Sequence, residues 1–215
     1  PGTELRFLGE DARGAFPHES WAPEAFDGSL RSAGRISGLA IEEAVRLALA
    51  GEVDAVVTGP IHKPALQAAG YAEPGHTELL QRLTGVPTVG MLMASESTRL
   101  GGPLRVLLAT THIALAQVDE RFTAELLVSQ VRLLHRELRR GWDMNAPRIA
   151  LCAVNPHASD DGMFGDTEAR VMAPAIQQLR AEGIEVSDPL PADTVFSRTL
   201  SGEFDAVVAP YHDVG

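Results

Sequence analysis

Four short polar clusters, each containing a histidine, follow apolar runs that read as strands. The clusters are TGPIHK (58–63), ATTH (109–112), NPHA (155–158) and YHD (211–213). In open α/β sheets ligands bind beyond the carboxyl ends of the strands, where residues distant in sequence converge. The four clusters therefore predict a ligand site at one edge of a sheet.

Several imidazoles converging on one point would suit a divalent cation of the zinc, cobalt or nickel kind, with open positions left for a substrate. Cys152 is the only cysteine, so neither a thiolate cage nor an internal disulfide can form within the chain. Each histidine alone also fits a simpler interpretation, a loop residue bonded to a backbone carbonyl. No HExxH spacing decides between the two, and both stay open on the residues alone.

A second candidate site is GHTE (75–78), which precedes a helical pattern. His76 and Thr77 could present side chains and backbone amides to an anion at that helix start, although an ordinary helix cap explains them equally well. Lys63 is the only lysine of the 18 basic residues, and it could neutralise a phosphate or a carboxylate or simply be exposed. Asp193 is predicted to cap the segment after it. No GxGxxG fingerprint occurs, so a conventional dinucleotide site is not encoded.

Apolar runs and amphipathic segments alternate along the chain, which predicts an α/β sheet covered on both faces. The strands are expected at 55–58, 88–93, 104–109, 149–154 and 206–209. The helices are expected at 38–50, capped by Ser37, at 123–140, and from Asp166 to near Gly183. Residues 5–8 could form a further strand, and 16–34 read as irregular structure.

The composition and net charge of the chain argue against nucleic acid and membranes as binding partners. The 215 residues are 45% hydrophobic and 22% charged, with a net charge of −11. Such a chain is repelled by nucleic acid and by anionic membranes. No apolar run approaches the roughly 20 residues needed to cross a bilayer, and a cytoplasmic protein is expected. The chain begins with Pro1 and stops soon after a predicted strand, so an internal stretch of a longer enzyme is expected.

The histidine clusters, together with GHTE and LPADT (190–194), occur in the order and at the spacing of a known family. From about residue 36 onward the chain resembles the 4-hydroxythreonine-4-phosphate dehydrogenases of pyridoxal phosphate biosynthesis. The resemblance implies NAD-dependent oxidation of 4-phosphooxy-threonine to a 3-oxo acid, which decarboxylates to 3-amino-2-oxopropyl phosphate. A metal ion on the alcohol oxygen would assist both steps.

The same resemblance implies a fold like that of isocitrate and isopropylmalate dehydrogenases, with two α/β/α domains, a cleft between them, and both ends incomplete. Residues 1–75 and 203–215 would belong to the first domain and 76–202 to the second. A homodimer is implied, in which both subunits contribute to the active site.

For the site, the resemblance implies a divalent metal on His112, His157 and His212, with zinc preferred and magnesium or cobalt as alternatives. It implies that His76 and Thr77 contact the phosphorylated substrate. NPHASD (155–160) departs from the family's NPHAGE. The family's GDPAGIGPE-like opening and its long final portion, which carries NAD contacts, have no counterpart here. The catalytic base and the NAD-binding residues are therefore unassigned.

Two alternatives remain. A sister dehydrogenase with the same three histidines would act on a phosphorylated four-carbon sugar acid, threonate or erythronate 4-phosphate. A catalytically silent, metal-binding paralogue belongs to a different class of function.

Overall fold

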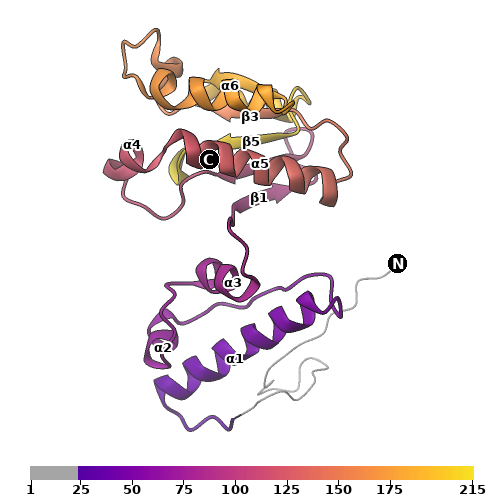
Figure 1. The fold of residues 1–215 in the computed structure, drawn as a ribbon, viewed down its shortest axis with the longest axis vertical. Helices are drawn as coiled ribbons and strands as arrows, with labels where there is room; N and C mark the ends of the chain where they lie inside the picture. Colours follow the sequence, from indigo (N-terminus) through magenta and orange to yellow (C-terminus); the bar gives the residue numbers. More distant parts are fainter. Residues whose placement is uncertain (1–23) are drawn as a thin grey trace. The chain divides into compact units, whose positions relative to one another are not determined.

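The computed structural model describes residues 24–215. The chain divides into two compact units, residues 1–87 and 88–215 (Figure 1). The strand predicted at 5–8 lies outside the described residues, as does the first part of the segment 16–34. Within the described part of the chain, no helix is long and apolar enough to span a membrane.

Helices make up the regular structure described in the first unit. They are α1 (Leu30–Leu49), α2 (Lys63–Ala68) and α3 (His76–Thr84). The small core joins α1 to α3 through Ile41, Val45 and Leu79. Helix α2 approaches α1 so closely at Gly34 that a Cβ atom there would lie 1.8 Å from the carbonyl oxygen of Ala65.

Helix α1 begins earlier than the sequence predicted. The Ser29 hydroxyl accepts a hydrogen bond from the Ser32 amide at 3.0 Å and so caps the helix. Ser37, the predicted cap, lies inside the helix and donates to the Ala33 carbonyl at 2.9 Å. The irregular structure predicted up to residue 34 therefore gives way to helix at Leu30, because Ser29 satisfies one of the first free amides, that of Ser32.

The strand predicted at 55–58 is wrong for the described structure. This segment has no regular secondary structure, and the Val57 side chain is 89% exposed. A strand needs a neighbour to satisfy its backbone amides and carbonyls. No strand occurs in residues 24–87 to supply one.

The second unit contains a five-stranded sheet with the order β1-β2-β5-β3-β4. Strand β1 runs antiparallel to β2, and the β2–β5, β5–β3 and β3–β4 pairs are parallel. The strands are β1 (Met91–Ser95), β2 (Leu104–Leu108), β3 (Ile149–Cys152), β4 (Val186–Leu190) and β5 (Ala206–Ala209). Long-range pairing thus places β5, the last strand in sequence, at the centre.

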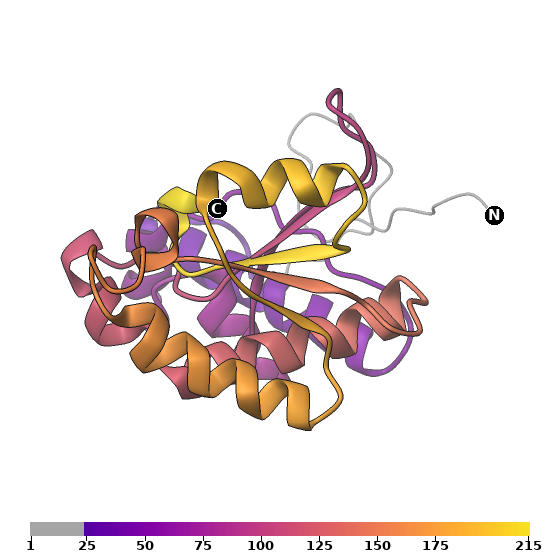
Figure 2. The same cartoon turned by 90° about the horizontal axis from the view of Figure 1, so that it is seen from above.

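Helices cover both faces of this sheet (Figure 2). On one face α5 (Ala124–Gly141) and α6 (Ala173–Ala181) pack on a core that includes Leu107, Leu151 and Val208. On the other, α7 (Ala192–Leu200) packs on alternate residues of the same strands. Because side chains alternate across a strand, one apolar run supplies both cores. Short helical turns complete the unit: η1 (Leu115–Gln117), α4 (Val118–Arg121), η2 (Pro156–Ser159), η3 (Glu168–Met172) and η4 (His212–Val214).

Most predicted elements of the second unit are confirmed. The strands predicted at 104–109, 149–154 and 206–209 and both predicted helices are present, and the strand predicted at 88–93 begins at Met91. Strand β4 was not predicted, because VSDPL contains Asp188 and Pro189, which are rare in strands. Strand β4 lies at the sheet edge, where Pro189 is tolerated.

The boundary between the units differs from the domain division that the family resemblance implies. Leu79 of α3 packs on α1, so residues 76–87 belong to the first unit. Strand β5 pairs with β2 and β3, which places residues 206–209 in the second. How a complete enzyme divides into domains stays a prediction.

Candidate functional site

Three of the predicted histidines follow adjacent parallel strands. His112 follows β2, His212 follows β5 and His157 follows β3. Parallel strands end at the same sheet edge, so the segments that carry these residues leave the sheet side by side. His62, the fourth, directly precedes α2 in the first unit and follows no strand.

His112 and His212 lie next to each other, with 5.6 Å between their ring centroids and 39° between the ring planes. Two imidazoles bound to one tetrahedral zinc would have centroids about 5 Å apart, given Zn–N bonds of about 2.0–2.1 Å. Both side chains are exposed. The centroid separation of this exposed pair is therefore close to that of two imidazoles on one metal ion.

Backbone and side-chain contacts hold this pair. Beyond the paired strands, the Thr110 amide and hydroxyl both donate to the Pro210 carbonyl, at 3.1 and 2.7 Å. Thr110 is buried. The segments carrying His112 and His212 are thus tied together close to the two imidazoles.

His157 lies on a loop with unusual backbone geometry. Five consecutive residues that are not glycine, 157–161, have φ between 46° and 73°. This left-handed region costs an ordinary residue roughly 1–2 kcal/mol. The exposed His157 ring lies 6.3 Å from the Phe164 ring, centroid to centroid. Such a loop persists only where surrounding contacts hold it.

The Glu168 carboxylate provides those contacts. One oxygen, Oε1, accepts from the backbone amides of Val154 and Asn155 at 2.9 and 2.8 Å. The other, Oε2, accepts from Asn155 Nδ2 at 2.9 Å and from the Ser159 hydroxyl. Burial favours a higher pKa for Glu168, but these hydrogen bonds outweigh it and lower the pKa below its ordinary value. Glu168 is therefore ionised at neutral pH.

In the part of the chain that the structure describes, no three His, Cys, Asp or Glu side chains form a metal-binding group. The structure brings His112 and His212 together and carries His157 on the neighbouring strand end. The metal site formed by the three histidines stays a prediction.

In the first unit, His76 is the first residue of α3 and is half-buried, while Thr77 is exposed. No side chain caps this helix, so its first amides are left to other partners. A Cβ atom at the preceding Gly75 would lie 3.5 Å from Glu78 Oε2 and 3.9 Å from Lys63 Cε. The structure thus brings the only lysine near the helix start that was predicted to receive an anion.

Asp193 does not cap α7 as predicted. Pro191 occupies the cap position, and Asp193 lies exposed in the first helical turn. An acidic residue there interacts favourably with the helix dipole without a capping hydrogen bond.

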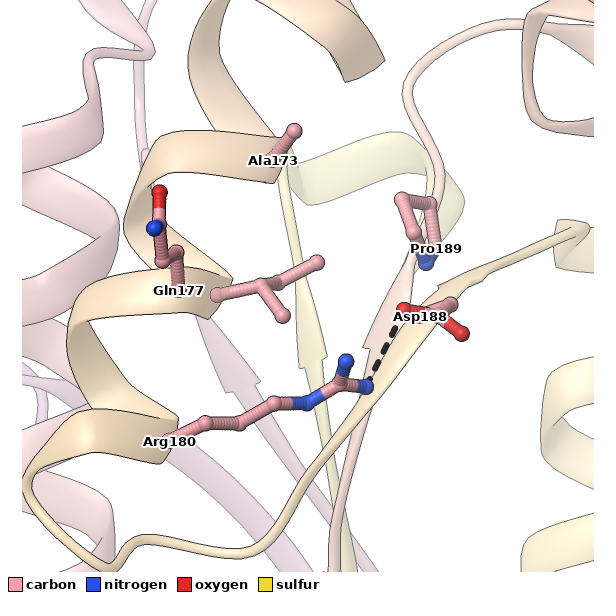
Figure 3. Close-up of a pocket in the computed structure, with 6 residues that line it drawn as sticks. Ala173, Gln177, Arg180, Asp188 and Pro189 are labelled. Carbon is pink, nitrogen blue, oxygen red and sulfur yellow. Dashed lines mark hydrogen bonds and ion pairs between the residues drawn. The ribbon is translucent and has the colours of Figure 1, made fainter.

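An open groove of about 390 Å³ lies between α6 and β4, and no histidine among the described residues lines it (Figure 3). Arg180 extends along it, donating to the Val186 carbonyl at 2.9 Å and pairing with Asp188 at 3.0 Å. The guanidinium is therefore held against the sheet edge by these two contacts.

Sequence reasoning missed Glu168, and it included Thr110 in the ATTH cluster without giving it a role of its own. Glu168 lies in a helical segment, where an acidic residue is usually solvated, yet its side chain is only 6% exposed. The signal for Thr110 was its place in TTH beside the histidine.

These features define an α/β protein with a candidate ligand site at the carboxyl edge of its sheet. The family model described as pyridoxal phosphate biosynthetic protein PdxA matches residues 23–215, and the chain belongs to this family. It is 49% identical over 176 residues to a 4-hydroxythreonine-4-phosphate dehydrogenase of Geobacter metallireducens, covering 82% of this chain and 50% of the relative. It is 45% identical over 182 residues to a Bradyrhizobium diazoefficiens protein, covering 85% of this chain and 51% of that one. That relative is provisionally named a D-threonate 4-phosphate dehydrogenase.

Among solved structures, 4-hydroxythreonine-4-phosphate dehydrogenase from Klebsiella pneumoniae matches with a TM-score of 0.81 and 43% identity, over 86% of this chain and 55% of that one. A terephthalate 1,2-cis-dihydrodiol dehydrogenase from Burkholderia xenovorans matches with a TM-score of 0.65 and 30% identity, covering 86% of this chain and 56% of the other. The chain thus spans about half the length of the proteins it matches.

Proposed function

We propose that this chain forms part of an NAD-linked, metal-dependent dehydrogenase that oxidises 4-phosphooxy-threonine. The product would be a 3-oxo acid that decarboxylates to 3-amino-2-oxopropyl phosphate. The observation that carries the proposal is the His112–His212 pair, with 5.6 Å between ring centroids, beside the strand end that leads to His157. The relatives named as dehydrogenases of this substrate support it.

The three histidines would hold a divalent cation, for which zinc is preferred and magnesium or cobalt are alternatives. Such an ion lowers the pKa of a bound alcohol and then polarises the ketone, which assists both oxidation and decarboxylation. Hydride acceptance belongs to NAD. Neutral imidazoles add no negative charge beside the substrate phosphate and carboxylate, which favours binding of an anionic substrate.

His76 and Thr77 would bind the substrate phosphate at the start of α3. The uncapped amides and the nearby Lys63 side chain support this role, because the N-terminus of a helix favours an anion. The catalytic base and the NAD contacts are not assigned to residues of this chain.

The wider architecture proposed is that of isocitrate and isopropylmalate dehydrogenases: a cytoplasmic homodimer with two α/β/α domains per subunit and active sites that both subunits complete. Light scattering of the active, full-length protein tests the oligomeric state. A monomer mass would contradict the shared site.

A second candidate substrate is threonate or erythronate 4-phosphate. The Bradyrhizobium diazoefficiens relative, 45% identical, favours keeping it. The reaction at the alcohol would be the same, so the two candidates differ in what lies beside the acid group.

The deciding experiment measures NADH formation by the full-length protein with each phosphorylated substrate and added Zn²⁺, Mg²⁺ or Co²⁺. The highest kcat/KM is expected with 4-phosphooxy-threonine. A higher value with a sugar-acid phosphate would select the second candidate. If the protein binds metal but forms no NADH with any substrate, it is a silent paralogue.

A further inference from the structure

The loop from Asn155 to Asp161 has a high conformational cost and few anchors. Its five left-handed residues are all non-glycine, so the isolated segment would favour other backbone conformations. The backbone hydrogen bonds of this loop are local: the Ala158 amide donates to the Asn155 carbonyl at 3.2 Å, and the Phe164 amide donates to the Ser159 carbonyl at 3.1 Å. A contact from outside the loop must therefore select this conformation.

Glu168 provides that contact on both sides of His157. Its carboxylate accepts from Asn155 before the histidine and from Ser159 after it. Four donors converge on a side chain that is only 6% exposed, and hydrogen bonds to a charged group are the stronger kind. The carboxylate thus constrains the position of the backbone that carries the His157 imidazole.

The element that carries Glu168 is itself anchored. Glu168 begins η3, a π-helical turn, a wider turn that is frequent at functional sites. The residue before it, Thr167, donates to Asp119 at 2.9 Å, and Arg170 bonds the same carboxylate at 2.6 Å. The buried Met172 fixes the other end of the turn in the core. Glu168 therefore holds the loop from a rigid base.

We propose that Glu168 is a positioning residue, which holds the loop so that His157 can complete a metal site with His112 and His212. The metal part of this inference rests on the proposed function. Glu168 would act through its hydrogen bonds to Asn155 and Ser159 and not through contact with the metal or the substrate.

The test compares Glu168→Gln with the unaltered full-length protein. Glutamine keeps the shape, but it removes the negative charge and one of the two acceptor oxygens that the four donors share. Asp205→Asn is the matched control. Asp205 also accepts several bonds, from the Arg148 amide at 2.8 Å and its guanidinium at 3.0 Å, but it precedes β5, at the opposite edge of the sheet.

Two measurements are made on each protein. Hydrogen exchange without metal is followed at the backbone amides of residues 154, 155 and 157–160, and the affinity for Co²⁺ alone is measured from its visible absorption. In Glu168→Gln we expect exchange about tenfold faster or more and Co²⁺ affinity at least tenfold weaker, the loss typical of a charged hydrogen bond. Asp205→Asn should lose stability and change neither quantity.

Unchanged exchange and unchanged Co²⁺ affinity in Glu168→Gln would overturn the inference. So would equal losses in Asp205→Asn, because they would mark a general effect of destabilisation. If Glu168→Gln does not fold, Ser159→Ala takes its place, since it removes one of the four donors. This variant must then show faster amide exchange and weaker Co²⁺ affinity, each by a smaller factor. Failure of the unaltered protein to bind Co²⁺ would overturn the proposed metal function; the exchange measurement would then decide the positioning role alone.

Discussion

Thr110 offers a direct test of how the paired histidines are held. Its buried hydroxyl donates to the Pro210 carbonyl at 2.7 Å, between the segments that lead to His112 and His212. Thr110→Val removes this hydroxyl and keeps the shape of the side chain.

The expected loss of stability follows from what stays behind. Pro210 keeps its second donor, the residue 110 amide at 3.1 Å, so no buried carbonyl is left unsatisfied. The cost should therefore be that of one ordinary hydrogen bond, about 1 kcal/mol in the free energy of unfolding, and not the larger penalty of an orphaned group.

Urea unfolding at neutral pH measures this difference, and Thr110→Ser is the control that keeps the hydroxyl but loses the methyl group. The valine variant should fall below the unaltered protein by about 1 kcal/mol. A valine variant as stable as the unaltered protein, or less stable by more than about 3 kcal/mol, would refute this account of the contact.

Three further predictions concern other parts of the chain. Burial raises the pKa of Cys152 to about 12, so its thiol should resist thiol reagents until the protein unfolds. An unfolded thiol ionises near pH 8.5, so the buried neutral thiol contributes its full stabilisation below that pH. As the pH rises to 10, the free energy of unfolding should fall by about 2 kcal/mol through this group. The Cys152→Ala variant should not show this fall. In α1, Gly34→Ala should destabilise by at least about 1 kcal/mol in urea, because overlap with the Ala65 carbonyl outweighs the helix propensity gained. Gly59→Ala, with nothing within 4 Å, should show no packing cost. His76→Ala should weaken substrate binding by roughly one to two orders of magnitude in calorimetry and leave metal content intact; unchanged affinity would remove the phosphate anchor.

Much of the second unit could be predicted from the sequence because its strands are short, apolar and buried on both faces. The runs at 104–108 and 206–209 alternate with amphipathic helices, a pattern typical of an α/β sheet. The same reasoning failed at 55–58. A run of apolar residues indicates a preference for a strand, whereas pairing depends on a neighbouring strand, and residues 24–87 contain none.

The candidate site likewise contains residues that could be predicted from the sequence and residues that could not. Histidines that follow strands could be found from spacing, because strand ends converge at one sheet edge. The roles of Glu168 and Thr110 could not, because they depend on hydrogen bonds to loop and strand-end backbone that only the folded chain brings within reach. The left-handed backbone of residues 157–161 was equally invisible, since the segment contains no glycine to mark it.

The central claim is that His112, His157 and His212 together bind one divalent metal ion. Elemental analysis of the full-length protein and of each His→Ala variant, purified identically with added Zn²⁺, tests it most directly. His135→Ala is the matched control, since this half-buried histidine lies on α5 and not at the carboxyl edge of the sheet. The account predicts one metal ion per chain in the unaltered protein and the control, and loss of tight binding in all three variants. Full occupancy in His157→Ala would contradict it.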